Sequence, residues 1–147
     1  MTRLRVTRRY PAPIDEVFAA WTDAESTAEW INVEAGPAHS VELDVRVGGR
    51  LRIRMGRNGS ADVEITGEYV EIVAPRRIVF TWRGSFPRGP DSLVTVTLAA
   101  LGPDDTELVL EHQGLPSEQS AKGHEAGWIA ITARLGQRWA ASSGSTA

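Results

Sequence analysis

The sequence predicts an α+β fold in which a curved antiparallel sheet of about six to seven strands wraps around one long C-terminal helix. A first strand is followed at once by two short helical segments. Residues 40–112 then alternate polar and apolar side chains between turn residues, which is typical of an antiparallel meander. Segment 117–141 has apolar residues at helical spacing, and of the predicted elements it has the length to cover the apolar sheet face.

The amino-acid composition excludes several classes of protein and of functional site. The chain has 147 residues, 41% hydrophobic and 24% charged, so we expect a single soluble domain over residues 1–147. The absence of cysteine excludes disulfides, a thiol nucleophile and thiolate metal ligands. A net charge of −3 argues against nucleic acid as the main partner.

Targeting signals are not expected in this chain. No apolar run approaches the roughly 20 residues that a membrane span needs. The charged N-terminus has no apolar block behind it, so it does not read as a secretory signal. We therefore expect a cytoplasmic protein.

The first elements are marked by proline and by capping residues. Arg3–Tyr10 alternates as a strand, and Pro13 suits the first position of a helix. The residues of that helix that share one apolar face are Ile14, Val17, Phe18 and Trp21. The capping-box pattern at 22–25 predicts a second short helix that begins at Thr22 and runs through Trp30.

The next strands allow their register to be predicted. Ser40–Val47 and Arg50–Met55 alternate on either side of a Gly-Gly turn, and Asn58-Gly59 marks a second turn. A two-residue loop there would place arginines on the apolar face. A three-residue loop over 58–60 instead gives the pairs Ile53 with Ile65, Met55 with Val63 and Arg54 with Glu64, and we expect this odd loop.

The remaining strands follow the same rules. Val70 and Ile72 are out of phase with Val63 and Ile65, which predicts either a bulge near Tyr69 or a strand covered on both faces. Three further strands are expected around 78–83, 94–98 and 107–112. A loop rich in glycine and proline, 84–90, carries Phe86 at its centre and is of a type that often borders pockets.

The C-terminal helix carries the main functional signal. Ser117 is a suitable N-cap, and residues 142–147 are expected to fray. Five residues share the apolar face of this helix: His124, Trp128, Ile131, Leu135 and Trp139. Gly123 and Gly127 either permit a bend in the helix or leave space beside His124 and Trp128. Because a curved sheet cannot follow a straight helix closely, we expect a ligand pocket at one end, with the two short helices closing its mouth.

Several segments together resemble a known superfamily. They are Ala12–Phe18, Ala20–Asp23, Trp30, Val47–Arg50, Gly67–Tyr69, Ile78–Trp82 and His124–Trp128. In this order they are similar to the START-like (SRPBCC, helix-grip) superfamily, and most similar to bacterial homologues of the activator of the heat-shock-protein-ninety ATPase. The resemblance implies a cavity under the C-terminal helix for lipids, polyketides, steroids or other small apolar molecules, with some members acting as enzymes. The family name also suggests a stress-response role and a chaperone partner, but no residue pattern in this sequence supports a chaperone partner.

Eight residues are candidates for the pocket. Those in the inward phase are Met55, Tyr69, Trp82, His112, His124 and Trp128, and those expected near the mouth are Trp30 and Phe86. Each inward histidine either satisfies a backbone carbonyl and packs, or acts on a ligand as an acid, base or hydrogen-bonding group. His39 lies far along the chain from both, so we expect no metal site, and no cofactor is implied.

Three functions remain open from the sequence. The first is binding of a small, mostly apolar molecule, and the second is a cyclase-type or hydrolase-type reaction that uses a cavity histidine. The third is an interaction module that uses the outer sheet face, as a co-chaperone would. On that face Arg50, Arg52, Arg54 and Arg57 stand opposite Glu64 and Glu68, a pattern that favours a solvated, ion-paired surface over a binding surface.

Overall fold

The computed structural model describes residues 2–32, 37–57, 60–84 and 91–144. These residues form ten elements: β1 Thr2–Tyr10, α1 Ile14–Thr22, α2 Ala24–Trp30, β2 Ser40–Leu43, β3 Arg50–Arg57, β4 Ser60–Val73, β5 Arg77–Gly84, β6 Ser92–Gly102, β7 Asp105–Leu115 and α3 Glu118–Gly144. The strands make one antiparallel sheet in the order β1-β7-β6-β5-β4-β3-β2. The predicted helix-grip fold is confirmed.

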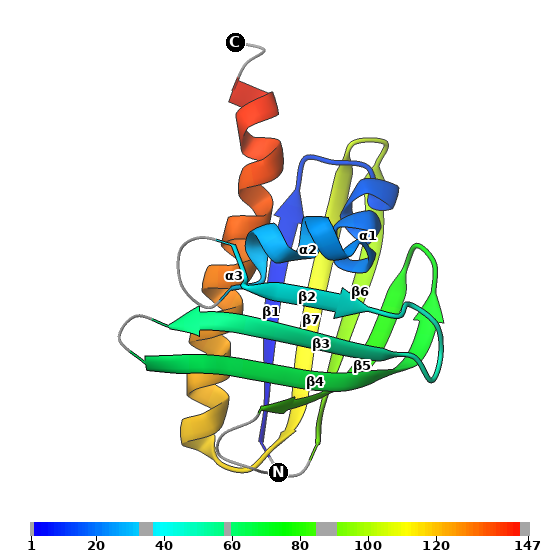
Figure 1. Cartoon of the computed structure of the whole chain (residues 1–147). Coiled ribbons are helices and arrows are strands. Elements are labelled where there is room, and N and C mark those ends of the chain that lie inside the picture. The colour runs from blue at the N-terminus through cyan, green and yellow to red at the C-terminus, as the bar shows by residue number, and fades with distance from the viewer. Residues whose placement is uncertain (1, 33–36, 58–59, 85–90, 145–147) are drawn as a thin grey trace.

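The sheet curls around the long helix. Figure 1 shows β3 and β4 running across the direction of β1 and β7, with α3 passing along the inner side. The helix contacts β1 and β7 directly, whereas α2 contacts both β2 and α3. The apolar faces of sheet and helices meet between these layers, and this interior is the core.

The two short helices are separated by a single residue. Asp23 is the N-cap of α2, and its carboxylate accepts a hydrogen bond from the backbone N–H of Ser26 at 3.1 Å. Thr22, predicted to start this helix, instead ends α1, and its hydroxyl donates to the carbonyl of Phe18. Pro13 likewise caps α1 and is not its first helical residue. The N-cap of α2 therefore lies one position later than predicted, because the Asp23 carboxylate accepts from a free N–H of the first turn.

Strand β2 is shorter than predicted. It ends at Leu43, because the chain then turns through hydrogen bonds from Arg46 N to the Asp44 carbonyl and from Gly49 N to the Arg46 carbonyl. Val47, predicted to continue the strand, is 65% exposed. Gly49 is required in this turn, since a Cβ there would lie 2.0 Å from the Asp44 carbonyl oxygen.

The predicted register of β3 and β4 is confirmed, but its cause differs. Ile53 pairs with Ile65 and Met55 with Val63, as expected. Arg57 pairs with Ser60, and the register shifts between Met55 and Arg57. The offset therefore arises within the strands and not from a three-residue loop, while residues 58 and 59 lie outside the described residues. An irregularity of this kind keeps the apolar faces aligned across a short connection.

The bulge predicted near Tyr69 is also present. Tyr69 pairs with Phe80 and Glu71 pairs with Val79, so Val70 has no partner in the β4–β5 ladder. The side chain of Val70 is 49% exposed. The extra residue returns the following part of β4 to phase with the core.

Helix α3 begins as predicted and extends further. The Ser117 hydroxyl accepts a hydrogen bond from Ser120 N at 3.1 Å, which confirms the N-cap. The helix continues through Gly144, although residues from 142 onward were expected to fray. Its buried residues include Trp128, Ile131, Leu135 and Trp139.

A polar clamp holds α3 against β1. Arg8 donates from Nε to the Thr132 hydroxyl at 3.0 Å and from a terminal nitrogen to the Ile129 carbonyl at 2.7 Å. The buried Tyr10 hydroxyl donates to the Thr132 carbonyl at 2.7 Å, and the Tyr10 ring packs on Trp139 with centroids 5.2 Å apart. Because these contacts hold the second half of the helix, that half lies close to the sheet.

The short helices cover the same half. Arg134 donates to the backbone carbonyls of Trp30 and Asn32, and Arg138 forms an ion pair with Glu29 at 3.1 Å. The expectation that α1 and α2 close a pocket mouth is therefore wrong for the cavity described below, which lies beside the first half of α3. Among the described residues, no helix is both long and apolar enough to cross a membrane.

Candidate functional site

A cavity of about 630 Å³ lies between the first half of α3 and strands β3, β4 and β5. Its lining residues are Met55, Val63, Ile65, Trp82, Gln119, Ser120, Gly123, His124, Gly127, Trp128 and Ile131. The strands supply apolar side chains, while the helix supplies the three polar ones. This size and this polarity are typical of pockets for small molecules.

Two glycines keep the helix wall open. A Cβ atom added to Gly123 or to Gly127 would meet no other atom within 4 Å. Each glycine costs a helix roughly 1 kcal/mol relative to alanine, and both follow the helical spacing of the cavity face. The space that they leave belongs to the cavity, as the sequence predicted.

Two tryptophans form the inner wall. The rings of Trp82 and Trp128 are tilted by 52° with centroids 5.0 Å apart. The Nε1 atom of Trp82 is buried and has no hydrogen-bond partner among the described residues. The indole N–H of Trp128 is hydrogen-bonded to His112. Both residues therefore present ring surface to the cavity and offer it no donor.

His112 lies behind Trp128 and has both ring nitrogens engaged. Trp128 Nε1 donates to His112 Nδ1 at 3.0 Å, and an indole nitrogen can only donate. His112 Nδ1 is therefore unprotonated, and the proton resides on Nε2, which donates to the Ser92 hydroxyl at 2.7 Å. Ser92 in turn donates to the Trp82 carbonyl at 2.9 Å.

Burial keeps the His112 ring neutral. Burial lowers the pKa of His112 to about 3, and the neighbouring His124 acts in the same direction. A ring with no free nitrogen and no tendency to gain a proton is poorly placed to act as an acid or base near neutral pH. The geometry instead gives it the role of orienting Trp128, whose ring lines the cavity.

His124 has the opposite arrangement. It is half-buried on the cavity wall, and its Nδ1 lies 2.8 Å from the Ser120 carbonyl. A carbonyl oxygen only accepts, so Nδ1 carries the proton and Nε2 holds a lone pair. Within the described part of the chain, Nε2 makes no hydrogen bond. His124 is thus the cavity residue with a free acceptor on an imidazole ring.

The eight predicted site residues separate into three groups. Met55, Trp82, His124 and Trp128 line the cavity, and His112 lies behind this lining, hydrogen-bonded to Trp128 and with its ring centroid 5.0 Å from that of His124. Trp30 and Tyr69 are buried in the core beyond the cavity. Trp30 donates to the Ala20 carbonyl at 3.2 Å, and Tyr69 borders a void of only about 20 Å³. Phe86 lies outside the described residues.

Sequence reasoning missed several lining residues. Val63, Ile65 and Ile131 were assigned to core faces, and Gln119 and Ser120 were not considered. Ser120 stands four residues before His124, so helical spacing alone could have placed it on the same wall. No pattern in the sequence links Ser92 to a histidine, and only the fold brings it from the start of β6 to the ring of His112.

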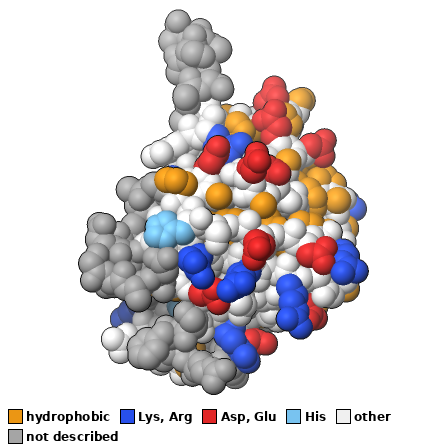
Figure 2. Space-filling model, viewed as in Figure 1, with side chains coloured by type: hydrophobic (Ala, Val, Ile, Leu, Met, Phe, Trp, Pro, Cys, Tyr) orange, Lys and Arg blue, Asp and Glu red, His pale blue; other side chains and the backbone are white. Residues whose placement is uncertain are grey.

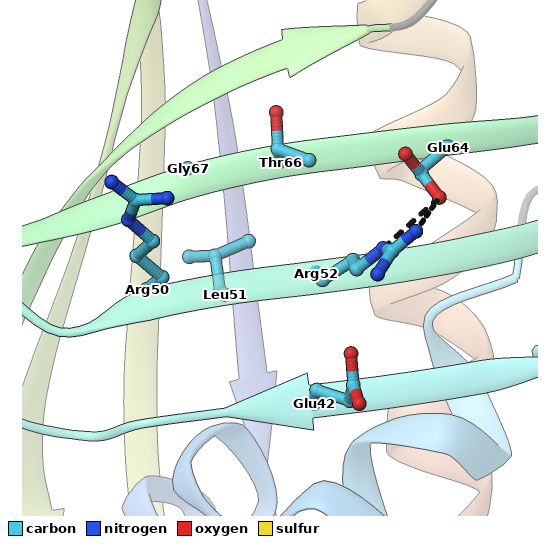
Figure 3. A pocket seen from close by; sticks show the side chains of 7 residues that line it. All are labelled: Glu42, Arg50, Leu51, Arg52, Glu64, Thr66 and Gly67. Carbon is cyan, nitrogen blue, oxygen red and sulfur yellow. Dashed lines mark hydrogen bonds and ion pairs between the residues drawn. The ribbon is translucent and has the colours of Figure 1, made fainter.

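The outer face of the sheet carries a separate, charged hollow of about 380 Å³. Figure 3 shows its lining, in which Arg52 of β3 reaches Glu64 of β4. Their nitrogen and oxygen atoms are 2.9 Å apart, and Arg54 lies 3.7 Å from the same carboxylate. In Figure 2 basic and acidic side chains are interspersed over the visible face. This mixture agrees with the ion-paired surface expected from the sequence.

The described residues bring no three potential metal ligands of the His, Asp or Glu type together. Among the described residues that line the cavity, His124 is the one titratable side chain, and none is a carboxylate, lysine or arginine. Such a site can bind and orient an apolar molecule through contact area and one hydrogen bond.

Known structures share the whole architecture. Protein Mll3558 from Rhizobium loti is 31% identical with a TM-score of 0.75, and the match covers 92% of this chain and 95% of that one. The HSP90 activator PFC0360w from Plasmodium falciparum is 26% identical with a TM-score of 0.74, over 92% and 94% of the two chains.

DynU16, a protein in the dynemicin biosynthetic locus, is 25% identical with a TM-score of 0.73, over 92% of this chain but 46% of DynU16. No curated protein matches the sequence. Residues 11–139 match the family described as Activator of Hsp90 ATPase homolog 1-like protein, and this match spans both short helices, the cavity strands and most of α3. The chain belongs to this family.

Proposed function

We propose that this protein binds a small, mostly apolar molecule in the cavity beside the first half of α3. The observation that carries the proposal is the 630 Å³ volume, with apolar side chains from three strands on one wall and two glycines on the other. Pockets of roughly 300–1,000 Å³ with few polar groups are the usual size for such ligands. The similarity to DynU16, from a biosynthetic locus, is compatible with a small organic ligand.

The chemistry of the lining supports binding over conversion. An acid–base enzyme of the cyclase or hydrolase kind needs a residue that can exchange a proton with its substrate. Both nitrogens of His112 are used inside the protein. The lining residues that the structure describes include no carboxylate to work with His124 as a second acid or base.

The test is a titration with a neutral apolar fluorophore, N-phenyl-1-naphthylamine. Its absorption overlaps tryptophan emission, so occupancy of the cavity beside Trp82 and Trp128 should quench the protein and make the probe emit. An organic extract of cells should then displace it, and native mass spectrometry should find the retained compound. A probe that stays dark, together with no retained mass, would contradict the proposal.

A second candidate is contact with an Hsp90-type ATPase. It rests on the 26% identity to the HSP90 activator from Plasmodium falciparum. Addition of this protein to a purified Hsp90 should then raise the rate of ATP hydrolysis. An unchanged rate at saturating protein would dismiss this candidate and leave the binding proposal in place.

A further inference from the structure

The polar groups of the cavity are confined to one place. Gln119, Ser120 and His124 all belong to the first two turns of α3, and each of the other described lining residues is apolar or a glycine. A ligand that matches this surface is apolar along most of its length and polar at one end. Because the described lining residues include no Asp, Glu, Lys or Arg, a permanent charge on the ligand would find no oppositely charged partner among them.

The tautomer of His124 decides which polar group fits. Its Nδ1–H is committed to the Ser120 carbonyl at 2.8 Å, so the free Nε2 accepts a hydrogen bond and cannot donate one. The neighbouring His112 ring stands edge-on with its centroid 5.0 Å away, and both its nitrogens are occupied by Ser92 and Trp128. His112 therefore cannot satisfy the lone pair of His124.

The inner wall of the cavity, formed by two tryptophan rings, favours a particular shape for the apolar part of the ligand. Trp82 and Trp128 present ring surface, and neither places a donor in the cavity. Ring surfaces of this kind pack well against flat aromatic molecules, in stacked or edge-on arrangements. Met55 adds a flexible side chain that adapts to irregular outlines.

We propose that the ligand is a flat aromatic molecule with a hydroxyl group that donates its hydrogen bond to His124 Nε2. This inference rests on the proposed function, since it assigns the ligand class of the same cavity. Aromatic alcohols of the phenol type combine the two required features, a planar apolar body and a strong O–H donor. His124 is then the residue that distinguishes a hydroxyl from an ether or a hydrogen at the same position.

The test compares three ligands that differ at one position. They are 4-phenylphenol, 4-methoxybiphenyl and biphenyl, each measured by displacement of N-phenyl-1-naphthylamine. We expect the phenol to bind about five to ten times more tightly than the other two, because one hydrogen bond contributes roughly 1 kcal/mol. In His124→Leu the advantage of the phenol should disappear, while biphenyl should bind about as before.

A matched control and a second measurement complete the test. Glu125→Leu makes a comparable change at the next, exposed position of the helix and should keep the preference for the phenol. In the wild type, the histidine 15N spectrum should show a shift at His124 Nε2 with the phenol but not with the ether. Equal binding of all three compounds, or a preference that survives in His124→Leu, would overturn the inference but leave the cavity function intact. Failure of all three to displace the probe would count against the proposed function itself.

Discussion

His112 and His124 meet edge to face, with ring centroids 5.0 Å apart and planes at 82°, yet they hold opposite tautomers. Trp128 donates to Nδ1 of His112, whereas Nδ1 of His124 donates to the carbonyl of Ser120. One ring therefore carries its proton on Nε2 and the other on Nδ1. The first ring is closed into the protein, and the second keeps a lone pair at the cavity wall.

The two tautomers can be observed directly. In a 15N–1H spectrum of the imidazole rings near pH 7.5 (roughly one unit above the ordinary histidine pKa), His112 should show the Nε2–H form. His124 should show the Nδ1–H form. Assignment follows from His112→Phe and His124→Leu, each of which removes one set of signals. Two rings of the same tautomer would contradict the hydrogen-bond pattern.

The neutral state of His112 predicts how stability depends on pH. The pKa of this ring is lowered from 6.5 to about 3 in the folded protein, chiefly by burial. Between these values the unfolded chain binds a proton that the folded chain does not. The contribution of His112 to the free energy of unfolding is therefore fully present above pH 6.5. Below that pH it falls by up to about 1.4 kcal/mol per pH unit.

Urea unfolding between about pH 7 and pH 5 checks this expectation. His112→Phe removes the titrating ring, so its free energy of unfolding should change less over this range than that of the wild type. The variant should be less stable at pH 7, since Trp128 and Ser92 lose a partner. Parallel curves for the two proteins would show that His112 does not carry the pH dependence.

The hydrogen bonds that link Trp128, His112 and Ser92 should contribute cooperatively to the free energy of unfolding. Ser92→Ala leaves the buried Nε2–H of His112 without an acceptor, and we expect a loss of about 1–3 kcal/mol in the free energy of unfolding. Ser26→Ala, at a partly exposed serine of α2, should cost less than about 0.5 kcal/mol. The double variant Ser92→Ala/Trp128→Phe should lose clearly less free energy of unfolding than the two single variants lose in sum. Strict additivity would mean that the three groups act independently.

A larger side chain on the helix wall of the cavity should weaken ligand binding without lowering the stability of the fold. Gly127→Leu adds a side chain to the cavity wall at a position where a Cβ meets no more distant part of the chain within 4 Å, so it should displace N-phenyl-1-naphthylamine and weaken its binding by about tenfold or more. Replacing glycine within a helix should also raise stability by up to about 1 kcal/mol. Ala126→Leu adds the same side chain at an exposed position and should bind the probe normally. Undiminished binding to Gly127→Leu would place the probe elsewhere.

Much of the fold could be predicted from local patterns. Alternation of apolar residues predicted the strands, and the requirement that apolar faces match gave the pairing of Ile53 with Ile65 and the bulge near Tyr69. The predictions of secondary structure were wrong mainly at the ends of helices and strands. Thr22 and Asp23 both have capping side chains, and only their backbone geometry decides between them.

The site depended on longer-range relationships. Residues of α3 share a face at known spacing, so sequence alone determined that His124, Trp128 and the glycines lie on one wall. It could not determine that Arg8 and Arg134 hold the second half of the helix close and leave the cavity beside the first half. Nor could it show that Ser92 and Trp128 occupy both nitrogens of His112. Spacing along one element is set by backbone geometry, whereas the partner of a side chain is set by which distant strands the whole sheet brings together.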